Sequence, residues 1–119
     1  MARDAPTIDA YGDGGFRLAG VRHHGSLLIL LDEPSAWPVT SMDQLTLAAF
    51  EPVLAAGRAE VEFVLLGAGV RNALPPRDVR EGLRAAGLGL EVMDTPAAAR
   101  LYNVLTSEGR RLATALIAV

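Results

Sequence analysis

The alternation of apolar and polar side chains predicts β-structure in the first third of the chain. Residues 7–11 alternate weakly and lead into the glycine-rich turn at residues 12–15, after which residues 16–21 alternate again. Ser26–Leu31 is an almost continuous apolar run, which is typical of a strand buried on both faces. We therefore expect a hairpin or meander followed by a buried strand, with residues 32–34 forming a solvated turn.

The middle of the chain has a weaker periodicity. Trp37-Pro38-Val39 predicts an extended connection, because proline fixes φ and has no N–H to donate. Leu47, Phe50 and Leu54 then recur at helical intervals, but Pro52 interrupts the pattern. We expect short or broken helical turns between residues 43 and 56.

The second half of the chain has the clearest pattern, a β-α-β-α-β order. Two crossovers of this length are nearly always right-handed and make three parallel strands. The predicted fold class is therefore α/β, with an N-terminal β-hairpin or meander and a C-terminal parallel unit, in a single domain over residues 1–119. The predicted elements are a strand at Val61–Leu66, a helix from Pro75-Pro76 to Ala86, a strand at Leu88–Met93, a helix from Asp94 to Glu108 and a strand at Leu112–Val119.

Two loops of the parallel unit carry the candidate site. They follow the first two parallel strands, and ligands of open α/β sheets usually bind at the carboxyl edge of such strands. Gly67 and Gly69 would let the backbone approach a ligand or a neighbouring chain closely. Asp94 and Thr95 lie at a helix N-terminus, where free N–H groups and the helix dipole favour an anion or a capping side chain.

The helix that follows adds further polar side chains. Arg100 and Asn103 are three residues apart and share a helix face, whereas Val104 and Leu105 are expected to point toward the core. A guanidinium, an amide, a carboxylate and a hydroxyl could therefore converge at the sheet edge. This arrangement predicts a recognition site for a ligand or a partner.

A structural interpretation of the same residues stands beside the functional one. Thr95 could be the helix N-cap, Asp94 could pair with Arg100 to fix the helix start, and Asn103 could hold a loop carbonyl. Trp37, the single tryptophan, could be a lid or a partner contact, or it could plug one end of the core. The sequence leaves both interpretations open for each residue.

Composition excludes several classes of chemistry. The chain has 119 residues, a net charge of −3, no cysteine, and arginine as its only strongly basic residue type. It therefore forms no disulfide, and an acidic chain without a basic stripe is a poor nucleic-acid binder. No apolar run approaches the roughly 20 residues of a membrane helix, and the N-terminus does not resemble a signal peptide. We expect a cytoplasmic protein without a transmembrane segment.

No cofactor or metal motif emerges from the sequence. The segment Gly67-Ala68-Gly69-Val70-Arg71-Asn72 has asparagine where a dinucleotide fingerprint needs glycine or alanine. Without lysine there is no phosphate-binding loop of the Walker type. His23 and His24 are adjacent, and in an extended chain they face opposite ways. We therefore predict no cofactor, no metal site and no catalytic residue.

Several blocks of the sequence together resemble a known family. They resemble a family of small conserved bacterial and archaeal proteins of unknown function, whose eukaryotic relatives include the mitochondrial complex I assembly factor 3 and an adipogenesis-associated Mth938-domain protein. The resemblance covers nearly the whole chain, and Leu101 departs from the threonine that relatives commonly carry. The blocks are Tyr11-Gly12-Asp13-Gly14-Gly15-Phe16, Ser26-Leu27-Leu28, Trp37-Pro38, Leu66-Gly67-Ala68-Gly69, Met93–Leu105 and Glu108-Gly109-Arg110-Arg111.

The resemblance implies a three-layer fold around a mixed β-sheet and no established enzyme activity. Through its mitochondrial relative it suggests protein–protein contact during respiratory complex I assembly. Our hypothesis is a non-catalytic binding or assembly-accessory protein whose partner contacts the Gly67–Gly69 and Asp94–Asn103 edge. The alternative is a binder of a small anionic ligand or an enzyme, with Arg100 as anchor and Asp94 as acid–base group. A third hypothesis makes this edge a self-association surface, and the oligomeric state is left open.

Overall fold

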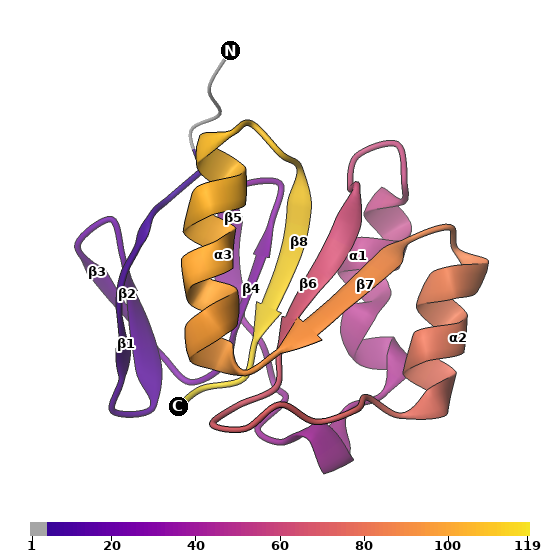
Figure 1. Ribbon diagram of the computed structural model, residues 1–119, viewed down its shortest axis with the longest axis horizontal. Helices are drawn as coiled ribbons and strands as arrows, with labels where there is room; N and C mark the ends of the chain where they lie inside the picture. The colour runs from indigo at the N-terminus through magenta and orange to yellow at the C-terminus, as the bar shows by residue number, and fades with distance from the viewer. Residues whose placement is uncertain (1–4) are drawn as a thin grey trace.

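The computed structural model describes residues 5–119 and contains two β-sheets (Figure 1). The smaller sheet is an antiparallel meander in the order β1-β2-β3, and the larger has five strands in the order β5-β4-β8-β6-β7. The predicted N-terminal meander is therefore confirmed. The strands are β1 (Ile8–Gly12), β2 (Gly15–Leu18), β3 (Val21–His24), β4 (Leu27–Leu30), β5 (Glu33–Ala36), β6 (Phe63–Gly67), β7 (Gly89–Met93) and β8 (Leu112–Leu116).

The helical segments lie between β5 and β6 and in the two crossovers. They are the 3-10 helices η1 (Met42–Gln44) and η2 (Leu47–Phe50) and the α-helices α1 (Glu51–Ala56), α2 (Arg77–Ala85) and α3 (Thr95–Ser107). The predicted broken turns between residues 43 and 56 are confirmed. Pro52 lies in the first turn of α1, where the N–H that it lacks has no intrahelical partner. Pro76 is the N-cap of α2 and not its first residue.

The C-terminal unit has the predicted parallel strands. β6 lies in the centre and pairs in parallel with β7 on one side and with β8 on the other. β8 also pairs antiparallel with β4, so the sheet is mixed. α3 therefore carries the chain from β7 across β6 to β8, as Figure 1 shows.

Side chains of the large sheet alternate between two cores. In β6, Val64 and Leu66 contribute to a core with α1, α2 and the 3-10 helices, whereas Leu65 contributes to a core with α3 and the meander. Because helical or β layers cover both faces, the strand reads as continuously apolar. The three-layer α/β fold with a mixed sheet is therefore confirmed.

Two strands of the structure were absent from the sequence prediction. Residues 16–21 are not one strand, because the chain reverses at Ala19-Gly20 and β3 follows. Residues 32–34 are not a free turn, because Leu31-Asp32 makes the reversal and β5 begins at Glu33. All four turn residues have positive φ, as two-residue hairpin loops of type I′ require. Pro34 fits in β5 because β5 is an edge strand.

Candidate functional site

One register row of the large sheet defines the edge at which the predicted site lies. Across the five strands this row pairs Ala36 with Leu27, Leu27 with Leu116, Leu116 with Gly67, and Gly67 with Met93. The chain leaves the row into the segments that begin at Trp37, Ala68 and Asp94. We call this end of the sheet the carboxyl edge, after the parallel strands that end there.

Thr95 joins the segments that leave the carboxyl edge. Its side chain is fully buried, and its hydroxyl donates to the Ile117 carbonyl at 2.7 Å and accepts from the Gly69 N–H at 2.9 Å. The Thr95 N–H in turn donates to the Gly69 carbonyl at 2.8 Å. One hydroxyl therefore links the exits of β6 and β8 to the start of α3.

The two glycines serve close approach within the chain. A Cβ on Gly67 would lie 2.9 Å from the Thr95 hydroxyl and 2.9 Å from a methyl of Leu116. Gly69 has φ +105°, a conformation that side-chain-bearing residues rarely adopt. At Gly67 the backbone therefore packs closely against β8 and the start of α3.

Asp94 is the N-cap of α3, and Thr95 is its first residue. An oxygen of Asp94 accepts from the Ala97 N–H at 2.9 Å, which satisfies one of the free donors of the first turn. Among the described residues Asp94 and Arg100 form no ion pair. Of the structural interpretations, the cap belongs to Asp94 and not to Thr95, and the Asp94–Arg100 pair does not form.

Asn103 and Arg100 contact the meander and not the loops of the carboxyl edge. The Asn103 amide accepts from the Ile8 N–H and donates to the Ile8 carbonyl, both at 2.9 Å, as a neighbouring strand would do. Arg100 is exposed and donates to the Tyr11 hydroxyl at 3.2 Å. Val104, expected in the core, is 53% exposed, because Tyr102 occupies the buried side of α3 instead. The structure thus brings Gly67, Gly69, Asp94 and Thr95 together and places Arg100 and Asn103 in a separate contact.

Trp37 packs into the core and also lines a groove at the surface. Its side chain is 5% exposed, its ring centroid lies 5.5 Å from that of Phe50, and its indole N–H donates to the Ala49 carbonyl at 2.9 Å. These contacts agree with the interpretation of Trp37 as a plug of the core. The same residue also lines a groove of about 430 Å³ between the end of β5 and α1.

The loop between Gly69 and Pro75 carries exposed apolar side chains that the sequence prediction missed. Val70 is 78% exposed and Leu74 is 75% exposed, the two largest values among the large apolar side chains of the described residues. The available signal was two apolar residues in a segment bounded by glycine and proline, where no helical or strand period could bury them. This loop leaves the carboxyl edge directly after the Thr95 contacts.

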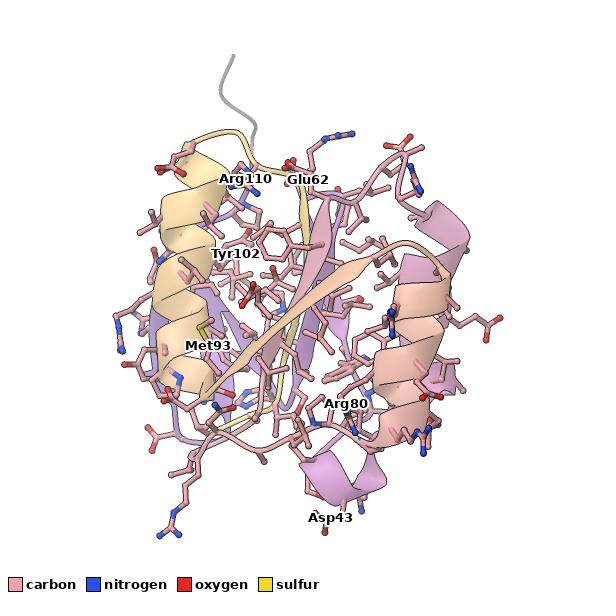
Figure 2. All side chains as sticks on the ribbon, turned by 45° about the vertical axis from the view of Figure 1, so that its right-hand side comes forward. Asp43, Glu62, Arg80, Met93, Tyr102 and Arg110 are labelled. Carbon is pink, nitrogen blue, oxygen red and sulfur yellow. The ribbon has the colours of Figure 1, made fainter. Side chains whose placement is uncertain are left out.

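A charged network holds the opposite end of β6 and β8, which we call the amino edge. The Glu62 carboxylate accepts from the Arg111 N–H at 2.8 Å and from the Arg110 guanidinium at 2.9 Å, and Figure 2 shows Glu62 and Arg110 side by side there. The Arg111 N–H and the Arg110 guanidinium lower the pKa of the Glu62 carboxyl. The guanidinium of Arg110 also lies 5.5 Å from the centre of the Phe63 ring. Arg110 and Arg111, which belong to the last block of the resemblance, therefore join the start of β8 to the start of β6.

Neither a metal cluster nor a membrane-length helix is found in residues 5–119. No three histidine, aspartate or glutamate side chains of this range gather as metal ligands. No helix in the described part of the chain is long and apolar enough to cross a membrane.

Known proteins match this chain over nearly its whole length. An uncharacterised protein of Rhodobacter capsulatus is 43% identical over 92% of this chain and 82% of its own length. The human protein named NADH dehydrogenase [ubiquinone] 1 alpha subcomplex assembly factor 3 is 33% identical over 98% of this chain. This chain spans 62% of the length of that human protein.

Solved structures share the arrangement of strands and helices. A Bartonella henselae structure, described as an outer membrane protein, is 34% identical and has a TM-score of 0.88 over 100% of this chain and 99% of its own. A structure described as MT938 is 16% identical with a TM-score of 0.67 over 97% of this chain and 100% of its own, which shows the shared fold alone. The profile of the family described as "Protein of unknown function (DUF498/DUF598)" matches residues 8–117. The chain therefore belongs to the DUF498/DUF598 family, as the resemblance of its sequence blocks predicted.

Proposed function

We propose that this protein is a non-catalytic assembly-accessory protein that binds a protein partner at the carboxyl edge of its large sheet. The family relationship supports an accessory role, since it includes a human protein named as an assembly factor of NADH dehydrogenase. The partner class that we propose is therefore a component of respiratory complex I or of its assembly intermediates.

The loop Val70–Leu74 is the single observation that carries this proposal. Its two ends are fixed: the Gly69 N–H donates to buried Thr95, and the Pro75 carbonyl accepts from Arg80 at 3.1 Å. Between these anchors, the side chains of Val70 and Leu74 are exposed to 78% and 75%. A loop with anchored ends loses less conformational entropy on binding than a free one, and exposed apolar side chains are typical of protein contacts.

The polar residues of the edge support recognition over catalysis. The Thr95 hydroxyl bonds two backbone groups, one Asp94 oxygen caps α3, and the Asn103 amide bonds both backbone groups of Ile8. Because these side chains hold backbone groups of the fold, the proposal assigns them a positioning role. In the proposal Gly67, Gly69, Asp94 and Thr95 position the binding surface, and Asn103 holds α3 against β1.

The test is a quantitative capture of complex I proteins from the cells that make this protein. Tagged wild-type protein and the double variant Val70→Ser/Leu74→Ser are expressed at equal levels, crosslinked in the cell and purified. We expect wild-type protein to enrich complex I subunits or assembly factors and the double variant to lose most of this enrichment. Truncating an apolar residue at the centre of an interface costs about 1–2 kcal/mol, or roughly tenfold in affinity, and the proposal places both residues there.

The matched control is Val104→Ser, which removes an exposed apolar side chain from α3, outside the loop. All three proteins should unfold at the same urea concentration, since none of the changed side chains is buried. Equal enrichment by wild-type protein and the double variant would contradict the loop as the contact. Recovery of no complex I protein by the wild type would contradict the partner class.

Arg100 favours a second candidate, a small anionic ligand. Its guanidinium is exposed, and the Tyr11 hydroxyl is its hydrogen-bond partner in the described part of the chain. Titration of the labelled protein with phosphate and with acetate, followed by amide chemical shifts, distinguishes the candidates. Saturable shifts around Asp94, Arg100 and Asn103 that vanish in Arg100→Gln would support the ligand; uniform or absent shifts would contradict it.

We also propose that the protein acts in the cytoplasm, on the composition of its sequence. The Bartonella relative described as an outer membrane protein makes a direct test necessary. Fractionation of intact cells should recover the protein with cytosolic markers, and recovery with the membrane pellet after a high-salt wash would overturn this location.

A further inference from the structure

The groove beside Trp37 is a concave feature that the proposed function does not use. Its volume of about 430 Å³ falls within the range of about 300–1,000 Å³ that ligand pockets occupy. Its strand side ends in Trp37 and Pro38, and its helix side consists of Glu51 and of the smaller residues Ala48, Ala49, Pro52 and Ala55. Small side chains on one wall leave room for the side chains of an occupant.

The groove borders the unpaired edge of the large sheet. β5 is the outermost strand, so its outer side faces no other strand in residues 5–119. The Trp37 N–H donates inward to the Ser26 carbonyl at 3.0 Å, and in an antiparallel pair the backbone groups of successive residues point to alternate sides. The N–H of Ala36 therefore points outward. Pro34 has no N–H, which confines strand pairing to the end of β5 next to the groove.

The charges around the groove are acidic. Glu51 lines it, is exposed, and forms no ion pair with any described residue. Glu33, two residues before the groove-lining Ser35, is also exposed and without an ion pair in the described part of the chain. Apolar walls with a carboxylate at the mouth select an occupant that has apolar side chains and a cationic group.

We propose that this groove binds an extended, apolar peptide segment of a protein partner that carries a lysine or arginine. The segment pairs with the outward Ala36 backbone, its apolar side chains enter the groove, and its cation faces Glu51. Adding a strand to an exposed sheet edge is a common mode of peptide recognition. The inference rests on the proposed function in taking the partner to be a protein. It adds a second contact, since Ala36 lies in the register row that also contains Gly67.

Trp37 provides the test, because it is the single tryptophan of the chain and lines the groove. The probe is a blocked octapeptide that alternates valine and serine and has one central lysine. We expect it to shift the tryptophan emission saturably and to shift the amide resonances of Ser35 and Ala36. Replacing the lysine by glutamate should weaken binding by about fivefold, the effect of a single exposed ion pair. A version with N-methylated backbone amides should bind more weakly still, because it cannot pair with β5.

Two variants locate the binding. Ala55→Arg fills the groove from an exposed position of α1 and should abolish the emission change, with folding verified by circular dichroism. Glu51→Gln should bring the affinity for the lysine peptide close to that for the glutamate peptide. The matched control is Glu60→Gln, which neutralises an exposed carboxylate outside the groove lining and should change neither affinity.

Several results would overturn the inference. These are an unchanged emission with every peptide, equal binding of the N-methylated peptide, equal binding to Glu51→Gln and wild type, or an equal response to butylamine alone, which would make the groove a small-molecule amine site. The peptide assay requires neither the loop Val70–Leu74 nor complex I. Failure of the groove is therefore measured separately from failure of the proposed function.

Discussion

The two ends of β6 and β8 are held together by different chemistry. At the carboxyl edge, a buried and neutral hydroxyl of Thr95 bonds the Gly69 N–H and the Ile117 carbonyl. At the amino edge, the exposed carboxylate of Glu62 bonds Arg110 and Arg111. Both sets of hydrogen bonds connect segments that adjoin the paired strands β6 and β8. Removing either set is therefore expected to change the stability of the fold, and stability has to be measured before any effect on function is interpreted.

The hydrogen bonds at the two ends also differ in how strongly solvent screens them and in which segments they hold. Salt and water screen the exposed charges of the amino edge, so they contribute little to stability. The buried bonds of the carboxyl edge are unscreened, and they fix the start of the loop that exposes Val70 and Leu74. In the proposed function, this anchored apolar loop is the surface that binds a protein partner. The amino edge presents no comparable pair of exposed apolar side chains among the described residues.

Thr95→Val should have the largest effect on stability. The substitution preserves the shape of the side chain and leaves the buried Gly69 N–H and Ile117 carbonyl without this partner. Unsatisfied buried polar groups cost about 1–3 kcal/mol each, so we expect a loss of about 3 kcal/mol in the free energy of unfolding. Urea unfolding measures it. Thr95→Ser keeps the hydroxyl and should lose about 1 kcal/mol for the deleted methyl group. A loss in Thr95→Ser with none in Thr95→Val would show that the methyl group, and not the hydroxyl, matters at this edge.

Gly67→Ala should be the next largest perturbation of the carboxyl edge. The new Cβ would lie 2.9 Å from the Thr95 hydroxyl and 3.0 Å from the Thr95 Cα, a backbone atom that cannot easily move. Overpacking of this kind costs about 1–3 kcal/mol, and we expect about 2 kcal/mol by urea unfolding. Gly14→Ala meets no atom within 4 Å but has φ +74°, and so provides a comparison in which conformational strain acts without a clash. Full stability of Gly67→Ala would mean that α3 can shift away from the sheet.

Much of the fold followed from the sequence, because periodicity and helix boundaries act locally. The β-α-β-α-β order could be predicted from apolar runs separated by proline and glycine at helix ends. β5 could not, because Glu33-Pro34-Ser35-Ala36 has no apolar alternation and is a strand only through pairing with β4. The turn at Leu31-Asp32 was equally hidden, since leucine rarely adopts the positive φ of 52° that it has there.

The candidate site could be predicted only in part. Gly67, Gly69, Asp94 and Thr95 converge because strand topology determines where loops leave a sheet. Arg100 and Asn103 lie apart from them, because the direction of a helical side chain depends on what packs beside the helix. Here β1 packs beside α3, and Asn103 bonds Ile8 across 95 residues of sequence. No local pattern contains such a contact.

Thr114→Val should stabilise the protein and so reverse the sign of the same chemical change at Thr95. Thr114 lies in the middle of β8, is fully buried, and its hydroxyl has no hydrogen-bond partner in the described structure. Valine has the same shape without the unsatisfied hydroxyl, and we expect a gain of about 1 kcal/mol in the free energy of unfolding. A lower free energy of unfolding in Thr114→Val would reveal a partner for the Thr114 hydroxyl, such as a buried water. Both hydroxyls would then stabilise the fold, and they would differ only in how much.

Glu62→Gln should have the smallest effect, and pH should control it. Hydrogen bonds from Arg111 and Arg110 lower the pKa of Glu62, so the Glu62 carboxylate takes up a proton less readily in the folded protein than in the unfolded chain. The resulting stabilisation is present above the pKa of the unfolded state and is lost as pH falls through the lower folded pKa. Urea unfolding between pH 7 and pH 3 should therefore show a small difference between Glu62→Gln and wild type at neutral pH that disappears in acid and shrinks with added salt.

The matched control is Glu91→Gln, which should give no such trend. Glu91 is an exposed carboxylate on β7 without an ion pair among the described residues. A difference that persists in acid would mean that Glu62 acts through its shape and neutral hydrogen bonds, which would make the two edges alike.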